Sequence, residues 1–167
     1  MRFRRKFFGI LTCILGVSGL IALKAPMFLS VESTGDISNK YQMLNSFDGM
    51  DTRFKALNKQ FEPAFANIVG IICIMFCVLY ALFLLCFLLQ YFKVGAIAYR
   101  PILRSIAVVM VLLGLLAIAG GLTFTIMNKV VIKGATVLSF KWGTGLYLLA
   151  FGSIVAGVSG AISQSRY

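Results

Sequence analysis

Residues 71–89, with the sequence IICIMFCVLYALFLLCFLL, decide the fold class because they form an uncharged apolar run about as long as a bilayer core is thick. Thirteen of these residues are Leu, Ile, Phe or Val. Each contributes roughly −0.3 to −0.6 kcal/mol to insertion as a helix, which amounts to about −4 to −8 kcal/mol together. The run therefore predicts a membrane-spanning helix that inserts without help from a partner.

The composition of the whole chain agrees with a membrane protein. The 167 residues are 60% hydrophobic and 13% charged, whereas a soluble domain is about 45–50% apolar and about 25% charged. Four apolar runs predict an all-α membrane protein, a single tetraspan domain over 1–167 with spans at 7–29, 64–92, 102–127 and 143–163. The outer loops are then 30–63 and 128–142. We interpret the first run as an uncleaved signal anchor, because no Ala-x-Ala site follows it.

The net charge of +11 is distributed unevenly along the chain. All five acidic residues fall within 24–62, a segment that also holds five basic residues and is neutral as a whole. The basic residues that flank the spans predict cytoplasmic N and C termini in a plasma or bacterial cytoplasmic membrane. The residues that set this topology are Arg2, Arg4, Arg5, Lys6, Lys93, Arg100 and Arg104. Nucleic acid is excluded as a partner, because these charges punctuate apolar runs instead of forming one water-facing surface.

The first outer loop carries an apolar stripe at helical spacing. Its large apolar residues follow one another at intervals of three or four positions, at Leu44, Phe47, Met50, Phe54, Leu57 and Phe61. The spacing predicts an extracytoplasmic amphipathic helix on the membrane surface or on the ends of the bundle. The alternative is a docking face for a helix of a partner.

The second outer loop has a different pattern, which is typical of strands. Two runs rich in β-branched residues, 130–132 and 135–140, flank Lys133-Gly134 and predict a small β-hairpin. Residues 27–31 are expected to supply another strand. Because an isolated hairpin is marginally stable in water, we expect this one to rest on the first loop or on a partner.

Small residues recur at positions where helices are expected to touch. The helix-packing candidates are Gly16, Gly114, Gly120, Gly152, Ala156, Gly157 and Gly160. Such residues let helices approach closely, which drives association once all surfaces lie in lipid. They either pack the four helices together or contact another subunit. The second span has only Gly70, so its surface is expected to face lipid or a partner.

The residues needed for catalysis or metal binding are scarce. The chain has no histidine, and no acidic residue lies within a predicted span. Its four cysteines all lie in spans, without ligands that could complete a metal site, and are expected to be structural. Lipidation of Cys86, near the cytoplasmic end of its span, is the alternative for that residue. We therefore predict that the protein is not an enzyme and has no cofactor.

The layout as a whole resembles the claudin-like tetraspan group. The shared features are a basic N terminus, four spans, a longer first outer loop, a strand-like second loop and the Gly/aromatic segment 141–147, KWGTGLY. The first loop lacks the tryptophans and the cysteine pair of the claudin signature. The resemblance implies lateral assembly, adhesion or service as an accessory subunit.

From these features we expect a non-enzymatic accessory or scaffold subunit of a larger membrane assembly. Its expected partners are membrane lipids and either other membrane protein subunits or further copies of the chain. The alternative is an oligomeric channel or transport component, whose pore would be lined by the few polar residues in the spans.

Overall fold

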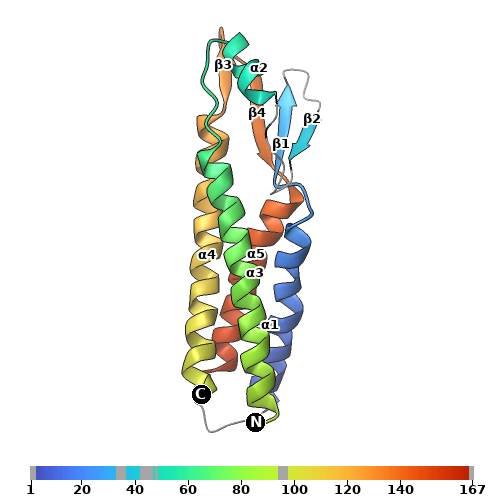
Figure 1. Ribbon diagram of the computed structural model, residues 1–167, viewed down its shortest axis with the longest axis vertical. Helices are drawn as coiled ribbons and strands as arrows, with labels where there is room; N and C mark the ends of the chain where they lie inside the picture. Colours follow the sequence, from blue (N-terminus) through green and yellow to red (C-terminus); the bar gives the residue numbers. More distant parts are fainter. Residues whose placement is uncertain (1–2, 33–36, 42–46, 48, 94–97, 166–167) are drawn as a thin grey trace.

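The computed structural model describes residues 3–32, 37–41, 47, 49–93 and 98–165, without the side chains of residues 4, 5, 38 and 39. Four long helices run side by side along the longest axis of the molecule (Figure 1). They are α1 (Phe3–Ala22), α3 (Ala64–Tyr91), α4 (Tyr99–Met127) and α5 (Thr144–Ser163). A small sheet and the short helix α2 (Met50–Ala56) lie beyond one end of these helices (Figure 1). We call this the sheet end, and the other end, where α4 begins and α5 finishes, the Arg100 end.

Helices α3, α4 and α5 are each long and apolar enough to cross a membrane. The prediction of a largely helical membrane protein is confirmed to this extent. The structure corrects the predicted first span, 7–29: α1 ends at Ala22, and its apolar part, Lys6–Ala22, is shorter than the other three helices. After Ala22 the chain turns, and from Met27, whose backbone N–H donates to Tyr41 O over 2.7 Å, it continues as a strand.

Packing of the helices follows a simple order. Helix α5 lies between α1 and α4 and has extensive contacts with both, and α4 also packs against α3. The backbones of α1 and α3 approach each other less closely. Aromatic rings of α3 fill the space between them, because Phe87, Tyr80 and Phe76 project toward Gly9, Gly16 and Gly19 of α1.

The sheet has four antiparallel strands in the order β2-β1-β4-β3. They are β1 (Phe28–Glu32), β2 (Ile37–Tyr41), β3 (Val130–Ile132) and β4 (Ala135–Trp142). The predicted hairpin is confirmed as β3 and β4, which are joined by Lys133 and Gly134 with φ of 49° and 79°. Positive φ at both residues is the requirement of a type I′ hairpin turn. The expected strand after the first helix is β1, whereas β2 was not predicted.

Strands β1 and β4 join distant parts of the chain. Phe28 pairs with Trp142 and Glu32 pairs with Leu138, so the segment after α1 lies beside the segment before α5. Just below the sheet, the backbone N–H groups of Gly143 and Gly145 donate to Met27 O and Pro26 O over 2.8 and 2.9 Å. The sheet is therefore continuous with the α1–α5 pair.

The amphipathic helix predicted over 44–61 is much shorter in the structure. Helix α2 covers only Met50–Ala56. It begins after Gly49, with φ of 79°, and Asn58, with φ of 53°, lies just beyond its end. These left-handed conformations stop the helix at both sides. Leu44 lies outside the described residues.

The described residues of the apolar stripe pack mainly against the core of the protein. Met50 and Phe54 are each 1% exposed and Phe61 is 8% exposed, while Phe47 and Leu57 are partly buried against the same core. Helical spacing correctly indicated that these side chains share one environment. It could not identify that environment, which is the underside of the sheet and the end of α4.

Candidate functional site

The structure places the predicted helix-packing residues where two helices meet. A Cβ added at Gly114 would lie 2.8 Å from Ala150 O, and one added at Gly157 would lie 2.5 Å from Ala107 O. Both glycines therefore sit in the closest approach of α4 and α5. The others of the set lie against side chains of a neighbouring helix: Gly16 against Tyr80, Gly120 against Val69, Gly152 against Ser18, and Gly160 against Phe83. Ala156 is fully buried.

Some polar groups inside the bundle join neighbouring helices, and others bond within their own helix. The hydroxyls of Thr12 on α1 and Ser159 on α5 lie 2.8 Å apart and share a hydrogen bond. Ser153 and Ser163 donate to carbonyls of their own helix, and the Tyr80 hydroxyl donates to Cys13 O across the α1–α3 contact. Among the described residues, no Asp, Glu, Lys or Arg side chain is buried.

All four cysteines are free thiols within the helices. Cys73 is buried, and Cys13, Cys77 and Cys86 are partly buried. In the described part of the chain, no group of three His, Cys, Asp or Glu residues could hold a metal ion. These side chains pack as small apolar groups.

Aromatic rings form the core of the sheet end. Phe140 on β4 lies at the centre, with ring centroids 4.9 Å from Phe124 on α4, 6.0 Å from Phe61 and 6.5 Å from Phe54. Phe28 on β1 packs on Phe124 at 4.3 Å. The rings link the sheet, α2 and the end of α4 into one unit, which we call the sheet module (β1–β4, α2 and residues 57–63).

Asn128 ties the sheet module to α4 and α3. Its side chain is fully buried at the end of α4. The Oδ1 atom accepts from the backbone N–H of Glu62 over 2.9 Å, and Nδ2 donates to Glu62 O over 3.0 Å and to Phe124 O over 3.1 Å. Both backbone groups of Glu62 are thereby satisfied just before α3 begins. The angle at which the chain returns to the bundle is fixed by these bonds.

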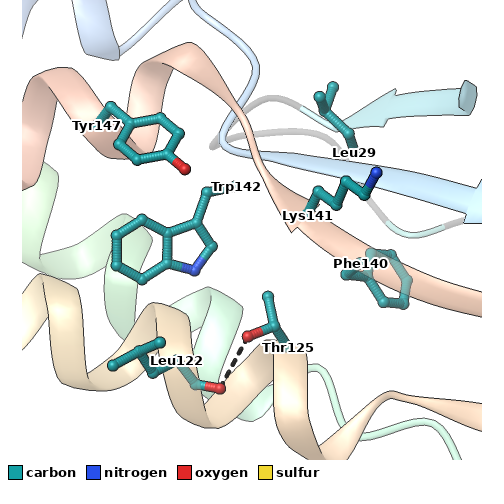
Figure 2. Close-up of a pocket in the computed structure, with 7 residues that line it drawn as sticks. All are labelled: Leu29, Leu122, Thr125, Phe140, Lys141, Trp142 and Tyr147. Carbon is teal, nitrogen blue, oxygen red and sulfur yellow. Dashed lines mark hydrogen bonds between the residues drawn. The ribbon is translucent and has the colours of Figure 1, made fainter.

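An open groove of about 460 Å³ lies at the junction of the sheet and the helices (Figure 2). Its lining comes from β1, β4, α4 and α5: Leu29, Leu122, Thr125, Phe140, Lys141, Trp142 and Tyr147. Figure 2 shows Trp142 between Tyr147 and the α4 side chains, and its ring centroid is 5.4 Å from that of Tyr147. We call this the junction groove.

The junction groove is lined mainly by apolar and aromatic side chains. The Thr125 hydroxyl donates to Leu122 O over 2.9 Å, and Lys141 is the charged side chain among the described lining residues (Figure 2). Trp, Tyr and Lys are the residues that favour the boundary between lipid and water. Sequence reasoning did not find this groove, although the Lys141-Trp142 pair at the start of an apolar run was a signal for such a boundary.

A second polar region occurs at the Arg100 end. Arg100 Nε donates to Gln164 O over 2.8 Å, which joins the start of α4 to the end of α5. The ammonium group of Lys6 lies 5.2 Å from the centre of the Tyr91 ring and joins α1 to α3. Lys93 and Arg104 are exposed. Arg2 and the side chains of Arg4 and Arg5 lie outside the described residues.

Comparison with known proteins adds no family assignment. The chain matches no model of a known protein family and no curated protein sequence. Its function is therefore argued from its own residues.

Proposed function

We propose that α1 is a fourth membrane span. Helices α1 and α5 have 20 residues each, which corresponds to about 30 Å in length. The two helices lie side by side (Figure 1). Its inner face carries Gly9, Gly16 and Gly19, whereas its outer face carries large apolar residues that are 41–64% exposed, namely Ile10, Ile14, Val17 and Ile21. A helix in water would bury the large residues and expose polar ones. This reversed distribution fits a helix surrounded by lipid.

The proposed depth in the membrane follows from α5. Helix α5 is about 30 Å long, which matches the thickness of a hydrocarbon core. Trp142 and Tyr147 lie near its beginning, and Gln164 with Arg100 lies at its end. The basic residues of the Arg100 end favour the cytoplasmic side. The sheet module would then project from the opposite surface into water.

We infer that the protein is an accessory or scaffold subunit that uses its sheet module to contact another membrane protein. A groove of about 280 Å³ between α2 and β4 carries this proposal. Its apolar floor is formed by Leu57, Val137 and Leu138, and the ion pair of Arg53 and Glu32, with an N–O distance of 3.0 Å, borders it. An apolar centre with a polar rim is the usual anatomy of a protein interface. We call it the α2–β4 groove.

The attachment of the sheet module supports this function. Each of the four long helices leads directly into the module or out of it, and Asn128 and the aromatic core lock the module onto α4. A groove held at a fixed angle to the membrane loses little conformational entropy when a partner binds. The layout is also in keeping with the claudin-like resemblance, which implies lateral assembly.

Photo-crosslinking in native membranes tests this proposal at two exposed positions of α2. Ala56 lines the α2–β4 groove, whereas Thr52 lies outside its lining, so a photoreactive residue at Ala56 reports on the groove and one at Thr52 serves as the matched control. We expect one discrete crosslinked protein from Ala56 and none from Thr52. Equal labelling from both positions, or a solitary monomer after purification in mild detergent, would contradict the proposal.

The alternative of an oligomeric channel gains no support from the described interior. Hydroxyl groups that could line a pore, such as those of Thr12 and Ser159, are paired with each other between α1 and α5. Others donate to carbonyls of their own helices. These bonds disfavour a pore lined by the hydroxyl groups of Thr12, Ser153, Ser159 and Ser163.

A further inference from the structure

The junction groove has a charged side and an aromatic side. Lys141 and Leu29 lie toward the sheet (Figure 2). Trp142 and Tyr147 lie toward the helices (Figure 2). The volume of about 460 Å³ falls in the range of pockets that hold small molecules, about 300–1,000 Å³. The groove therefore offers a cation and an apolar surface to one ligand, which is the pattern that an amphiphile requires.

The aromatic side of the groove is held in place by the surrounding elements. The Trp142 ring packs over Gly121 of α4, where an added Cβ would lie 3.3 Å from the ring. Its centroid is 5.4 Å from that of Tyr147 on α5. The backbone is fixed as well, because the N–H of Gly143 donates to Met27 O over 2.8 Å. A wall that is already ordered loses little conformational entropy when a ligand binds.

A strip of apolar side chains continues from the groove along α5. Tyr147 stacks on Phe151 with a centroid distance of 6.2 Å and an interplanar angle of 9°. Val155 and Val158 follow at intervals of four and three residues, so the four side chains share one face of the helix. All four are about half exposed. Because α5 is long and apolar enough to cross a membrane, this α5 strip offers an acyl chain a path from the groove into the hydrocarbon layer.

Two lysines give the sheet side of the groove its positive charge. Leu29 of β1 pairs with Lys40 of β2 on one side and with Lys141 of β4 on the other. Directly opposed strand residues lie on the same face of a sheet, so the two lysines flank Leu29 in one row. Both are exposed, and two strand spacings, about 9–10 Å, separate their backbones. This row attracts a negatively charged group to the sheet side of the groove.

The order of these features matches the order of groups in a phospholipid. Lysines near a membrane surface attract anionic lipid headgroups, and Trp and Tyr favour the boundary between headgroups and hydrocarbon. The lysines of the groove lie on the sheet, beyond the helices, and the α5 strip leads away from them along the bundle. A lipid with its charge toward the sheet and its acyl chain toward the bundle therefore meets a matching surface at each level.

We propose that the junction groove binds an anionic phospholipid of the leaflet next to the sheet module, with its phosphate at Lys141 and an acyl chain along the α5 strip. Lysine binds phosphate as a point charge. The proposal rests on α5 crossing the membrane. It goes beyond the accessory function proposed above and requires no partner at the α2–β4 groove.

Native mass spectrometry of the full chain in mild detergent tests the proposal with added phosphatidylglycerol and, separately, phosphatidylcholine. Lys141→Gln tests the charged side. Its matched control is Lys129→Gln, since Lys129 is exposed just beyond the end of α4 and outside the groove lining. Tyr147→Ala tests the aromatic side, with Tyr91→Ala as control, because Tyr91 is about equally exposed at the Arg100 end. Thermal unfolding of each variant without lipid verifies that the fold is intact.

We expect the unmodified chain to retain one phosphatidylglycerol in preference to phosphatidylcholine. Lys141→Gln should weaken the binding of phosphatidylglycerol about fivefold, and Tyr147→Ala should weaken the binding of both lipids about threefold. Each control should change binding by less than about twofold. Equal losses in Lys141→Gln and Lys129→Gln, unchanged binding in Tyr147→Ala, or no preference for the anionic lipid would overturn the site.

Two further measurements distinguish the lipid from other occupants of the groove. A photoreactive residue in place of Tyr147 should form adducts with phospholipid in native membranes. A discrete crosslinked protein in place of these adducts would overturn the lipid assignment in favour of a partner helix. Displacement of phosphatidylglycerol by millimolar inorganic phosphate would overturn it in favour of a soluble phosphate compound.

Discussion

Replacing Gly157 with alanine should push α4 and α5 apart and destabilise the bundle. The new Cβ would lie 2.5 Å from Ala107 O and 2.9 Å from Val111 N. Both are backbone atoms of a helix, so they cannot move without shifting α4 as a whole. Overpacking of this kind costs about 1–3 kcal/mol. The greater helix propensity of alanine offers little compensation, because helices separated in a membrane remain helical.

Gly160→Ala provides the matched control on the same helix. There the added Cβ would lie 3.1 Å from the Ala107 Cβ and 3.2 Å from the Phe83 ring, so a shift of only a few tenths of an ångström relieves both contacts. The same chemical change is therefore made at both positions with different neighbours. We expect Gly157→Ala to be less stable than Gly160→Ala by about 1–2 kcal/mol, roughly a tenfold difference in the unfolding equilibrium constant.

Reversible unfolding in mixed micelles of sodium dodecyl sulfate and dodecyl maltoside measures this difference. Helix content by circular dichroism should stay nearly constant, while a probe of helix separation reports the transition. If the two variants unfolded at the same detergent ratio, the close backbone contact at Gly157 would not limit the approach of α4 and α5. The reasoning would then have to be abandoned for the other glycines of the bundle as well.

Three further substitutions test the sheet module. Phe140→Ala should cost about 3–5 kcal/mol and speed hydrogen exchange of the sheet amides; the exposed Phe151→Ala control should leave exchange unchanged, and similar exchange in both variants would contradict a central role for Phe140. Asn128→Leu should lower thermal stability by about 1–3 kcal/mol, because both backbone groups of Glu62 lose their partners. An unchanged midpoint of thermal unfolding would mean that the hydrogen bonds between Asn128 and Glu62 do not stabilise the fold. Arg53→Ala should cost less than about 1 kcal/mol, since both members of its ion pair are about half exposed; a larger loss in thermal unfolding would mean that the pair is coupled to the core.

The two ends of the bundle differ in their chemistry, and this difference organises the proposed roles. The sheet end has an aromatic core, two grooves and the described acidic residues Glu32, Asp51 and Glu62. The Arg100 end joins helices through Arg100 with Gln164 and Lys6 with Tyr91. Protein contact is accordingly proposed at the sheet end.

Local sequence patterns were sufficient where one element fixes its own structure. The uncharged run at 71–89 lies wholly within α3, because the cost of burying polar groups in lipid depends on composition alone. The β3–β4 hairpin was also predicted, since Lys133-Gly134 supplies the backbone conformation that joins its strands. Neither inference needed to know which other part of the chain packs against the segment.

The same methods failed where the partner of a segment decides its conformation. Strand β2 has a polar sequence, ISNKY, and exists because β1 offers it a paired edge. The stripe from Leu44 to Phe61 had helical spacing, yet the described helix is only Met50–Ala56. Burial of Phe61 against Phe140 stabilises the remaining segment without further helix.

The sequence by itself determined the largely helical membrane class and three segments long and apolar enough to cross a membrane, because hydrophobicity acts over neighbouring residues. Only the tertiary structure decided that β1 pairs with β4, that the apolar stripe is buried and that Arg100 meets Gln164. Those contacts join residues that are distant along the chain. Their free energy depends on the relative placement of whole helices, which no local pattern of residues specifies.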